Sequence, residues 1–155
     1  VELVMVEKIL AALFLAVPLT ALAAGSSDSS PSSASEDSTW SEARALVEEG
    51  RFESAIPLLF EVVGEDNEHV EAYNLLGFTH RKTGKLDAAF KYYNKALALK
   101  PGHRGAHEYI GEAYLEIGDL ASAKKHLAFL DEDCVFGCKE YDMLKESIAK
   151  FEARN

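Results

Sequence analysis

Two cysteines lie four positions apart in the stretch CVFGC, at Cys134 and Cys138, and the chain contains no others. A thiolate zinc site needs four ligands, haem attachment needs C-x-x-C-H, and a thioredoxin-like site needs C-x-x-C after a strand, so the sequence disfavours all three. Residues four apart in a helical turn have Cα atoms about 6 Å apart, a distance that a disulfide spans. We predict a disulfide across a tight loop, with two free thiols or a labile redox pair as the alternatives.

Histidines form a second candidate for chemistry, because His103 and His107 are separated by four residues, a spacing that permits two ligands to share one metal ion. No third ligand is evident in the sequence around them. We therefore expect no metal and no cofactor. The alternative is a metal- or redox-responsive accessory protein that uses these histidines together with the cysteine pair.

Enzymatic and nucleic-acid functions receive no support from motifs or charge. The chain has no Gly-rich phosphate loop, no G-x-S-x-G elbow and no H-E-x-x-H helix. Its formal net charge is −10 with a pI near 4.9, and it has no cluster of Lys and Arg with which to neutralise phosphates. We predict a non-enzymatic protein that binds neither nucleic acid nor an anionic membrane.

The N-terminal residues have the features of a targeting segment. Residues 9–22 carry no charge, Lys8 precedes them, and Ala21-Leu22-Ala23 offers a small-x-small cleavage site. The apolar run is shorter than the roughly 20 residues that a bilayer span needs. We predict a cleaved signal peptide over residues 1–23, no stable membrane insertion afterwards, and a periplasmic or secreted protein, in a compartment where thiols oxidise. The alternative is an uncleaved inner-membrane anchor facing the periplasm.

A serine-rich segment and then a repeat follow this leader. Residues 24–38 contain eight serines and no large apolar residue, so we predict a disordered linker there. From Thr39 onward glycines recur every 34 residues, at Gly50, Gly84 and Gly118, and alanines recur at the same interval. Apolar residues at helical spacing on both sides of each glycine predict a stack of helical hairpins, each glycine ending a first helix.

One unit carries a series of residues in a recognisable order: Tyr73, Leu76-Gly77, Gly84, Ala89, Tyr93, Ala96 and Pro101. This pattern resembles the tetratricopeptide repeat (TPR) family, and in particular small exported bacterial members. The resemblance implies an all-α array, an α-solenoid of three repeats (about 36–69, 70–103 and 104–137) within residues 39–137. A T-x-x-E capping box at Thr39 predicts the start of ordered structure. Residues 138–152, apolar on one face, predict a capping helix.

The resemblance also implies a concave groove, lined by the first helix of each repeat, that binds a peptide or a partner protein. By position, the groove residues are Trp40, Arg44, Asn74, Phe78, Arg81, Lys82, Glu108, Glu112 and Glu116. Phe78 could contact a partner or pack under a neighbouring helix. The three glutamates form an acidic stripe that could attract a basic peptide or a cation, or could be a solvated face.

A family clamp for chaperone C-termini, built from Lys, Asn and Arg, is absent. Its positions hold Trp40, Arg44, Leu75, Gly105 and Tyr109. The sequence therefore predicts a scaffold or interaction module whose partner is a protein or peptide other than a chaperone tail.

Overall fold

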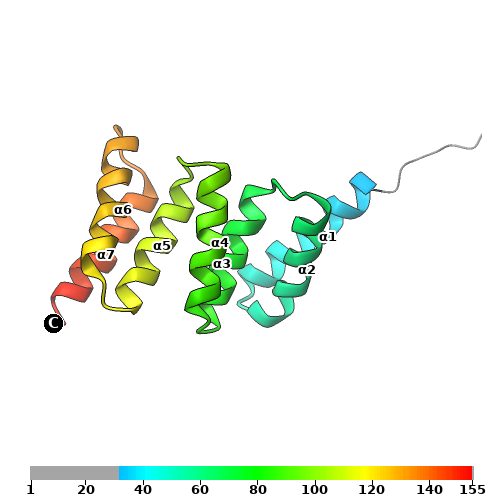
Figure 1. Ribbon diagram of the computed structural model, residues 1–155, viewed down its shortest axis with the longest axis horizontal. Coiled ribbons are helices and arrows are strands. Elements are labelled where there is room, and N and C mark those ends of the chain that lie inside the picture. Colours follow the sequence, from blue (N-terminus) through cyan, green and yellow to red (C-terminus); the bar gives the residue numbers. More distant parts are fainter. Residues whose placement is uncertain (1–31, 155) are drawn as a thin grey trace, which may run out of the picture.

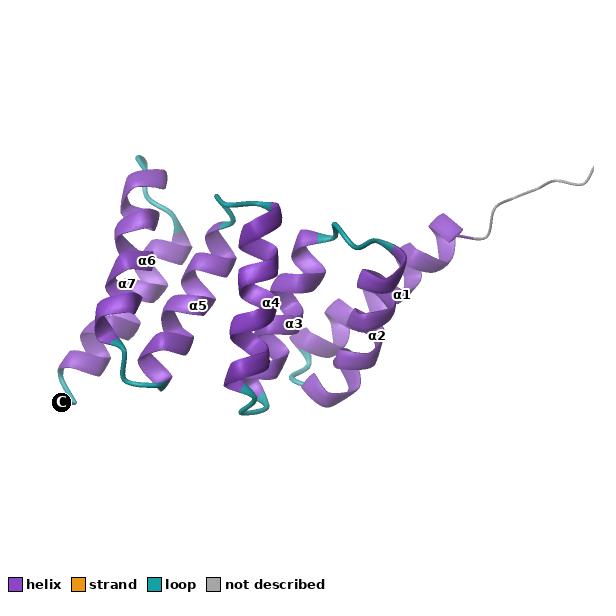
Figure 2. Cartoon of the chain, in the orientation of Figure 1, coloured by secondary structure: helices purple, strands orange, loops and turns teal. Residues whose placement is uncertain are grey.

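A computed structural model describes residues 32–154 of the chain, and these residues form seven helices and no strand (Figures 1 and 2). In chain order the helices are α1 (Ser32–Glu48), α2 (Phe52–Glu65), α3 (Val70–Lys82), α4 (Leu86–Leu99), α5 (Arg104–Glu116), α6 (Leu120–Asp133) and α7 (Lys139–Glu152). The pairs α1–α2, α3–α4 and α5–α6 are antiparallel hairpins that stack side by side. The predicted all-α repeat architecture is confirmed.

The turn inside each hairpin is built around a glycine in the left-handed conformation. Gly50, Gly84 and Gly118 have φ angles of 74°, 75° and 81°. At each turn the glycine N–H donates three residues back, and the following N–H donates five residues back, as in Lys85 N to His80 O at 2.8 Å. This double closure satisfies the last carbonyls of the first helix and needs a residue without a Cβ. The three predicted bends are therefore equivalent.

Small residues let the helices of the stack approach closely. A Cβ added to Gly77 would lie 2.4 Å from the ring of Tyr93, and one added to Gly111 would lie 2.6 Å from Leu144. The first contact joins α3 to α4, and the second joins α5 to α7. Ala89, Tyr93 and Ile110 are almost completely buried around these contacts. Both glycines are thus required by close packing rather than by an unusual backbone angle.

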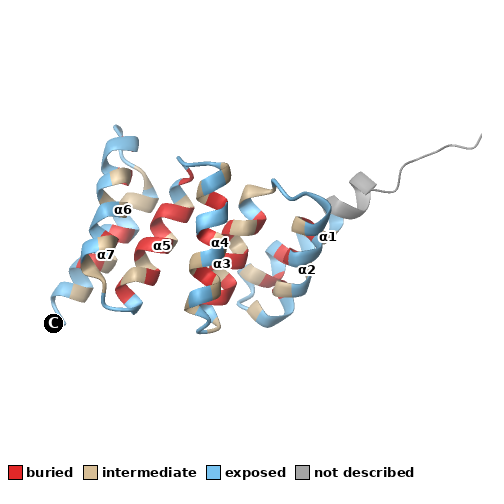
Figure 3. Cartoon of the chain, in the orientation of Figure 1, coloured by how far each residue is buried: buried red, intermediate tan, exposed pale blue. Residues whose placement is uncertain are grey.

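The hydrophobic core is continuous along the stack and consists of three neighbouring clusters (Figure 3). One is centred on Leu59 and Leu76, the next on Tyr93 and Ile110, and the last on Leu130 and Leu144. Each of these six residues is at most 1% exposed to solvent. Because every cluster uses residues from two adjacent hairpins or from the last hairpin and α7, no unit buries its apolar surface alone. None of the helices formed by residues 32–154 is long and apolar enough to cross a lipid bilayer.

The N-terminal boundary differs from the prediction. Helix α1 begins at Ser32, inside the segment 24–38 predicted to be disordered, so Thr39 lies within the helix and the predicted capping box is wrong. The Thr39 hydroxyl instead donates to Glu61 Oε1 at 3.3 Å. A helix that is already nucleated extends at little cost in free energy, because each added residue contributes one more hydrogen bond. The predicted signal peptide, residues 1–23, lies outside the described residues.

Helix α7 continues the repeat rather than only closing it. Leu76, Ile110 and Leu144 are spaced by 34 residues, and all three are buried. Ile148 is buried beside Leu144, and Tyr141 and Phe151 pack against the same cluster. The helix therefore occupies the position of the first helix of a fourth, incomplete repeat, and its apolar face covers the end of the third.

The cysteine pair lies in the connection between α6 and α7. The two sulfur atoms are 2.03 Å apart, at disulfide distance, and the Cα atoms are 5.6 Å apart. The spacing of the two cysteines suggested a helical turn, but they lie outside the helices. Cys134 follows the last residue of α6, and Cys138 precedes the first residue of α7. Between them, Gly137 has a φ of 83°. Cys134 is buried in the last core cluster.

Substitution of Gly77 tests the close approach of α3 and α4. Gly77→Ala places a methyl group against the Tyr93 ring, and we expect a loss of about 1–3 kcal/mol in the free energy of unfolding. Gly64→Ala is the matched control, because nothing lies within 4 Å of that added Cβ inside α2. The control should be neutral or slightly stabilising in urea denaturation, and equal effects of the two variants would contradict the packing argument.

Reduction tests the cysteine pair. Closure of a five-residue ring by a disulfide contributes about 2 kcal/mol in the loop-entropy treatment, so dithiothreitol should lower the free energy of unfolding by that amount. The double variant Cys134→Ser, Cys138→Ser should show the lower value with and without reductant. Two free thiols in the mass spectrum of the non-reduced protein would contradict the bridge.

Candidate functional site

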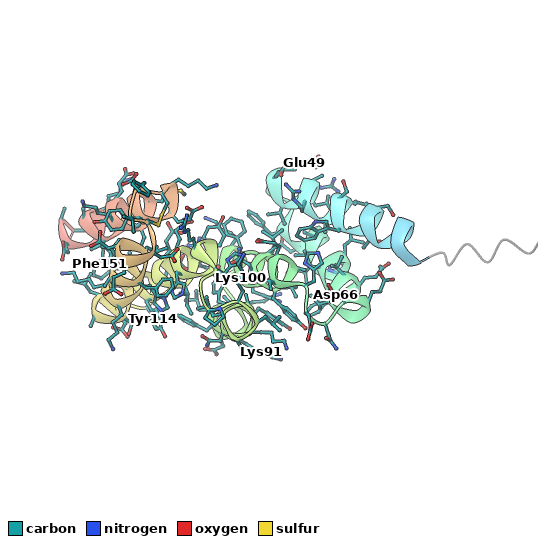
Figure 4. All side chains as sticks on the ribbon, turned by 90° about the horizontal axis from the view of Figure 1, so that it is seen from above. Glu49, Asp66, Lys91, Lys100, Tyr114 and Phe151 are labelled. Atoms are coloured by element: carbon teal, nitrogen blue, oxygen red, sulfur yellow. A yellow bond between two sulfur atoms is a disulfide. The ribbon has the colours of Figure 1, made fainter. Side chains whose placement is uncertain are left out.

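A groove of about 970 Å³ runs along one face of the stack. It is lined by α1, α3 and α5, by the turn before α5, and by the first residues of α7. In the view along the helices, α1 and α7 rise on the same side of the molecule, whereas Lys91 of α4 lies on the opposite side (Figure 4). The groove therefore lies on the concave face, and the second helices of the hairpins form the back of the stack.

The nine residues predicted to line this groove fall into two groups. Arg44, Asn74, Phe78 and Glu108 line it. The other five do not, and they lie elsewhere on or under the same helices: Trp40, Arg81, Lys82, Glu112 and Glu116. Trp40 packs instead against His69, with ring centroids 4.5 Å apart, and against the first core cluster. Sequence position thus indicated the helices that line the groove, but it did not distinguish the residues that line it from those that pack between the helices.

Arg81 belongs to the framework. Its side chain is 5% exposed, and its guanidinium contacts Glu112 Oε2 and Glu116 Oε1, each at 2.7 Å. The Ser147 hydroxyl of α7 donates to the other oxygen of Glu112 at 3.0 Å. Charge-assisted pairing of one guanidinium with two carboxylates fixes the relative position of the helices that carry them, so Arg81 joins α3 to α5 and, through Glu112, to α7.

The acidic stripe therefore has a role that neither sequence interpretation anticipated. Glu112 and Glu116 are partners of Arg81 rather than a solvated face or a free cation site. Only Glu108, the first of the three, faces the groove without a partner. A sequence signal for this pairing exists, because Arg81 precedes Glu116 by 35 residues, which is about one repeat. The sequence did not show, however, which side chains turn toward each other.

Phe78 packs against neighbouring helices and also lines the groove. Its ring is half-buried and contacts Phe52 at 5.7 Å and Tyr109 at 4.9 Å between centroids. The exposed part of the ring lines the groove, and Lys82 Nζ lies 5.4 Å from its centroid. Phe78 thus links its own repeat to both neighbouring repeats and also supplies apolar surface to the groove.

Two buried polar side chains lie on the groove floor. Glu108 is 3% exposed and Asn74 is 4% exposed, and both line the groove. Glu108 Oε1 and Asn74 Oδ1 have no hydrogen-bond partner in the structure. Burial, followed by the charges of Glu112 and Glu140, raises the pKa of Glu108 to about 8. A buried acceptor without a partner costs stability, which makes these two atoms the chemically most distinctive feature of the groove.

Sequence reasoning missed the wall that α7 contributes. Lys139, Glu140 and Met143 line the groove together with Leu75 and Tyr109. Four of the five clamp positions line the groove, and Arg44 is the only cation among them: Arg44, Leu75, Gly105 and Tyr109. The interval of 34 residues from Ile110 to Leu144 indicates that α7 is equivalent to the first helix of a repeat and lies on the concave side. From the sequence, however, we interpreted this segment only as a cap and therefore did not include it in the groove.

The histidines do not assemble a metal centre. His103 accepts from Ala106 N through Nδ1 at 3.0 Å, and its Nε2 lies 2.7 Å from Glu71. His107 is held by the Pro101 carbonyl at 2.8 Å and by His126, with the two Nδ1 atoms 2.9 Å apart. Among the residues that the structure describes, no three His, Cys, Asp or Glu side chains are grouped so that they could hold a metal ion.

Comparison with known proteins agrees with this geometry. Two family models, both described as tetratricopeptide repeat, match residues 41–104 and 80–147. No curated protein matches the chain.

Several solved structures share the fold. The Yersinia enterocolitica type III secretion chaperone SycD, in complex with a peptide of the translocator YopD, is 21% identical with a TM-score of 0.67, over 79% of this chain and 93% of that one. PcrH, in complex with the chaperone binding region of PopD, is 14% identical with a TM-score of 0.67, over 77% and 90%. The second repeat domain of human RPAP3, in complex with an HSP70 peptide, is 20% identical with a TM-score of 0.64, over 76% and 94%.

The paired histidines predict a dependence of stability on pH. Burial lowers the pKa of His107, and burial together with His107 and Lys125 lowers the pKa of His126 to about 4. At His107 and His126 the unfolded chain therefore binds more protons than the folded chain between about pH 6.5 and pH 4, so the contribution of these two residues to stability falls as the pH falls through that range, against the opposite contribution of Glu108. After allowance for partial exposure we expect a loss of about 2 kcal/mol.

Urea denaturation at a series of pH values measures this loss. His126→Gln keeps a polar partner for His107 and removes the titrating ring, so its stability should depend less steeply on pH than that of the natural chain. An equal slope for both proteins would show that other groups control the acid response.

Proposed function

The chain belongs to the tetratricopeptide repeat family, and on that premise we propose that it is a non-enzymatic interaction module whose groove binds a peptide segment of a partner protein. The observation that carries the proposal is the groove itself, a concave surface of about 970 Å³ that combines apolar side chains with a few polar ones. Surfaces of this composition suit binding, because apolar area supplies affinity and sparse polar groups supply register.

Apolar contact surface is available at three places along the groove. Val47 and Leu75 lie toward α1, Phe78 and Tyr109 lie in the middle, and Met143 lies at the α7 end. The Met143 side chain is 46% exposed although it is apolar. An extended segment or a short helix with side chains at regular intervals would cover these positions. The three similar structures described above, each solved with a peptide or a binding region of another protein, support this mode of use.

The polar groups exclude one class of partner. Leu75, Gly105 and Tyr109 stand where the family's clamp for chaperone C-termini carries cationic or amide side chains, so of the clamp positions only Arg44 brings a cation to the groove. Two of the arginines that line the groove are already paired with carboxylates, Arg44 with Glu48 and Arg104 with Asp133. Arg81, the most buried cation beside the groove, is already paired with two glutamates. We propose an internal segment of the partner rather than its C-terminus as the ligand.

The proposed compartment is the periplasm or the cell exterior. The apolar residues 9–22 and the small residues at 21–23 support export, and a cysteine pair at bonding distance suits an oxidising environment. N-terminal sequencing of the protein recovered from its natural host distinguishes a cleaved leader from a retained anchor.

Site-specific photocrosslinking in the source cell tests the groove. A photoreactive amino acid replaces Met143 in one variant and Phe60 in the other. The two side chains are matched, because both are apolar and partly exposed, at 46% and 42%, but Phe60 lies on α2 and does not line the groove. We expect a discrete crosslinked partner from position 143 and none from position 60.

The variant Phe78→Ala provides the second arm of the same experiment. Loss of groove surface should reduce crosslinking from position 143 by about tenfold if Phe78 contributes as interface aromatics commonly do. Equal crosslinking from positions 143 and 60, or a product unaffected by Phe78→Ala, would place the partner on another face and would contradict the proposal. Circular dichroism of each variant confirms that the helices remain folded.

A further inference from the structure

We propose that the groove selects a long cationic side chain, Lys or Arg, of the bound segment, whose charged end is received on the groove floor by Glu108, Asn74 and Glu140. This inference rests on the proposed function, because it specifies which chemistry the bound segment presents. It concerns the centre and the α7 end of the groove, where α3, α5 and α7 meet.

Glu108 provides the principal acceptor. It lies on α5, its side chain is almost completely buried, and Oε1 has no hydrogen-bond partner although the residue lines the groove. The other carboxylates of this helix face are satisfied, since Glu112 and Glu116 both bind Arg81. A buried carboxylate gains most from a partner that brings both a positive charge and N–H donors, and Lys and Arg side chains bring both.

Asn74 provides the second acceptor from the neighbouring repeat. It lies on α3, is 4% exposed, and leaves its own side-chain oxygen without a partner. Gly105, one turn before Glu108 on α5, brings the two helices together here, because a Cβ added to it would lie 3.4 Å from the Asn74 amide. Two unpartnered acceptors on adjacent helices therefore line the same groove.

Glu140 adds negative charge from the third side. It lies in the first turn of α7, its side chain is 17% exposed, and its nearest cation, Lys139 Nζ, is 3.8 Å away on an 81% exposed side chain. That distance is at the outer limit of an ion pair, and an exposed pair of this kind contributes little. Glu140 is thus free to attract a cation that enters beside Glu108.

The walls suit the aliphatic part of such a side chain. Phe78 and Tyr109 line the groove next to Glu108, with ring centroids 4.9 Å apart, and Met143 lies on the α7 side. Lys and Arg bury their methylene stems on apolar surface while the charged end reaches a polar group, and aromatic rings attract the cation itself. The arrangement of apolar walls and carboxylate floor favours an organic cation over a metal ion, for which the described residues assemble no set of three ligands.

The state of Glu108 couples binding to pH. The charged and titratable groups that act on it are Glu112 on its own helix, Glu140 and Lys139 on α7, and Arg81 on α3. Burial and the two glutamates raise its pKa to about 8, whereas the two cations oppose the rise. In the free protein at neutral pH the carboxyl is therefore mainly protonated. A cation binds the ionised form, so binding releases a proton and affinity increases with pH until the carboxyl of the free protein is ionised.

Selection from a random peptide library tests the inference. The library is displayed on phage and panned at about pH 9 against the purified chain and, separately, against Glu108→Gln, which keeps the shape of the side chain but removes its charge. Glu146→Gln is the matched control, because Glu146 is an exposed carboxylate of α7 that does not line the groove and is paired with Lys150 at 2.6 Å. We expect the natural chain and the control to enrich peptides with Lys or Arg at one fixed position, and Glu108→Gln to lose that preference.

Calorimetry with one selected peptide supplies the quantitative arm. Affinity for the natural chain should rise at least about tenfold between roughly pH 6 and pH 9, with proton release that depends on the buffer, and both effects should disappear in Glu108→Gln. The same peptide with its basic residue replaced by Gln should bind with no dependence on pH in this range. Because Glu108→Gln removes a buried charge, its thermal midpoint at about pH 9 should exceed that of the natural chain, which separates loss of binding from loss of folding.

The outcomes separate this inference from the proposed function. The enriched peptides could bind in the groove, as shown by sensitivity to Phe78→Ala, and yet carry no basic residue at a fixed position. That result would overturn the inference and leave the proposed interaction module intact. Failure to enrich any peptide, together with equal crosslinking from positions 143 and 60, would overturn both. Stoichiometric binding of a metal salt that depends on Glu108 would replace the organic cation with an inorganic one and would likewise overturn the inference.

Discussion

The close approach of paired helices is the constraint on which the rest of this structure depends. Gly77 accepts the Tyr93 ring, and Gly111 accepts Leu144, at distances that any larger residue would block. Turn glycines with positive φ close each hairpin so that the two helices stay antiparallel. Because each unit then leaves part of its apolar surface uncovered, the units must stack. A stack of such hairpins has one face formed by first helices, and the groove is that face.

The charged residues beside the groove serve two purposes, and burial alone does not distinguish them. Arg81 and Glu108 are both nearly inaccessible, at 6% and 3% exposed. Arg81 has two carboxylate partners, so its charge holds α3, α5 and α7 in register. Glu108 lacks a partner for one of its oxygens and has a raised pKa, so it destabilises the ionised free protein. An unsatisfied buried group of this sort is expected where a ligand completes the interaction.

Helix α7 connects stability with the site. Its inner face covers the last core cluster through Leu144 and Ile148, and its first two turns supply Glu140 and Met143 to the groove. The cysteine loop precedes this first turn directly, with Cys134 buried in the same cluster and Cys138 adjacent to the helix. A covalent link at this point limits how far the start of α7 can move, so the redox state of the loop and the shape of the α7 end of the groove are physically linked.

The sequence by itself determined the architecture, because the period of 34, the turn glycines and the alternation of small and large apolar residues all describe local geometry that repeats. The repeat pattern also placed four of the nine predicted residues, on α1, α3 and α5, along the groove. Only the tertiary structure decided which residues of those helices are accessible. Arg81 points inward and pairs with Glu112 and Glu116. Trp40 packs against His69, whereas Glu108 lines the groove. The start of α1 at Ser32 and the wall formed by α7 were likewise not evident from the sequence. Pairing across a repeat depends on the relative position of side chains 30 or more residues apart, which a period in the sequence does not specify.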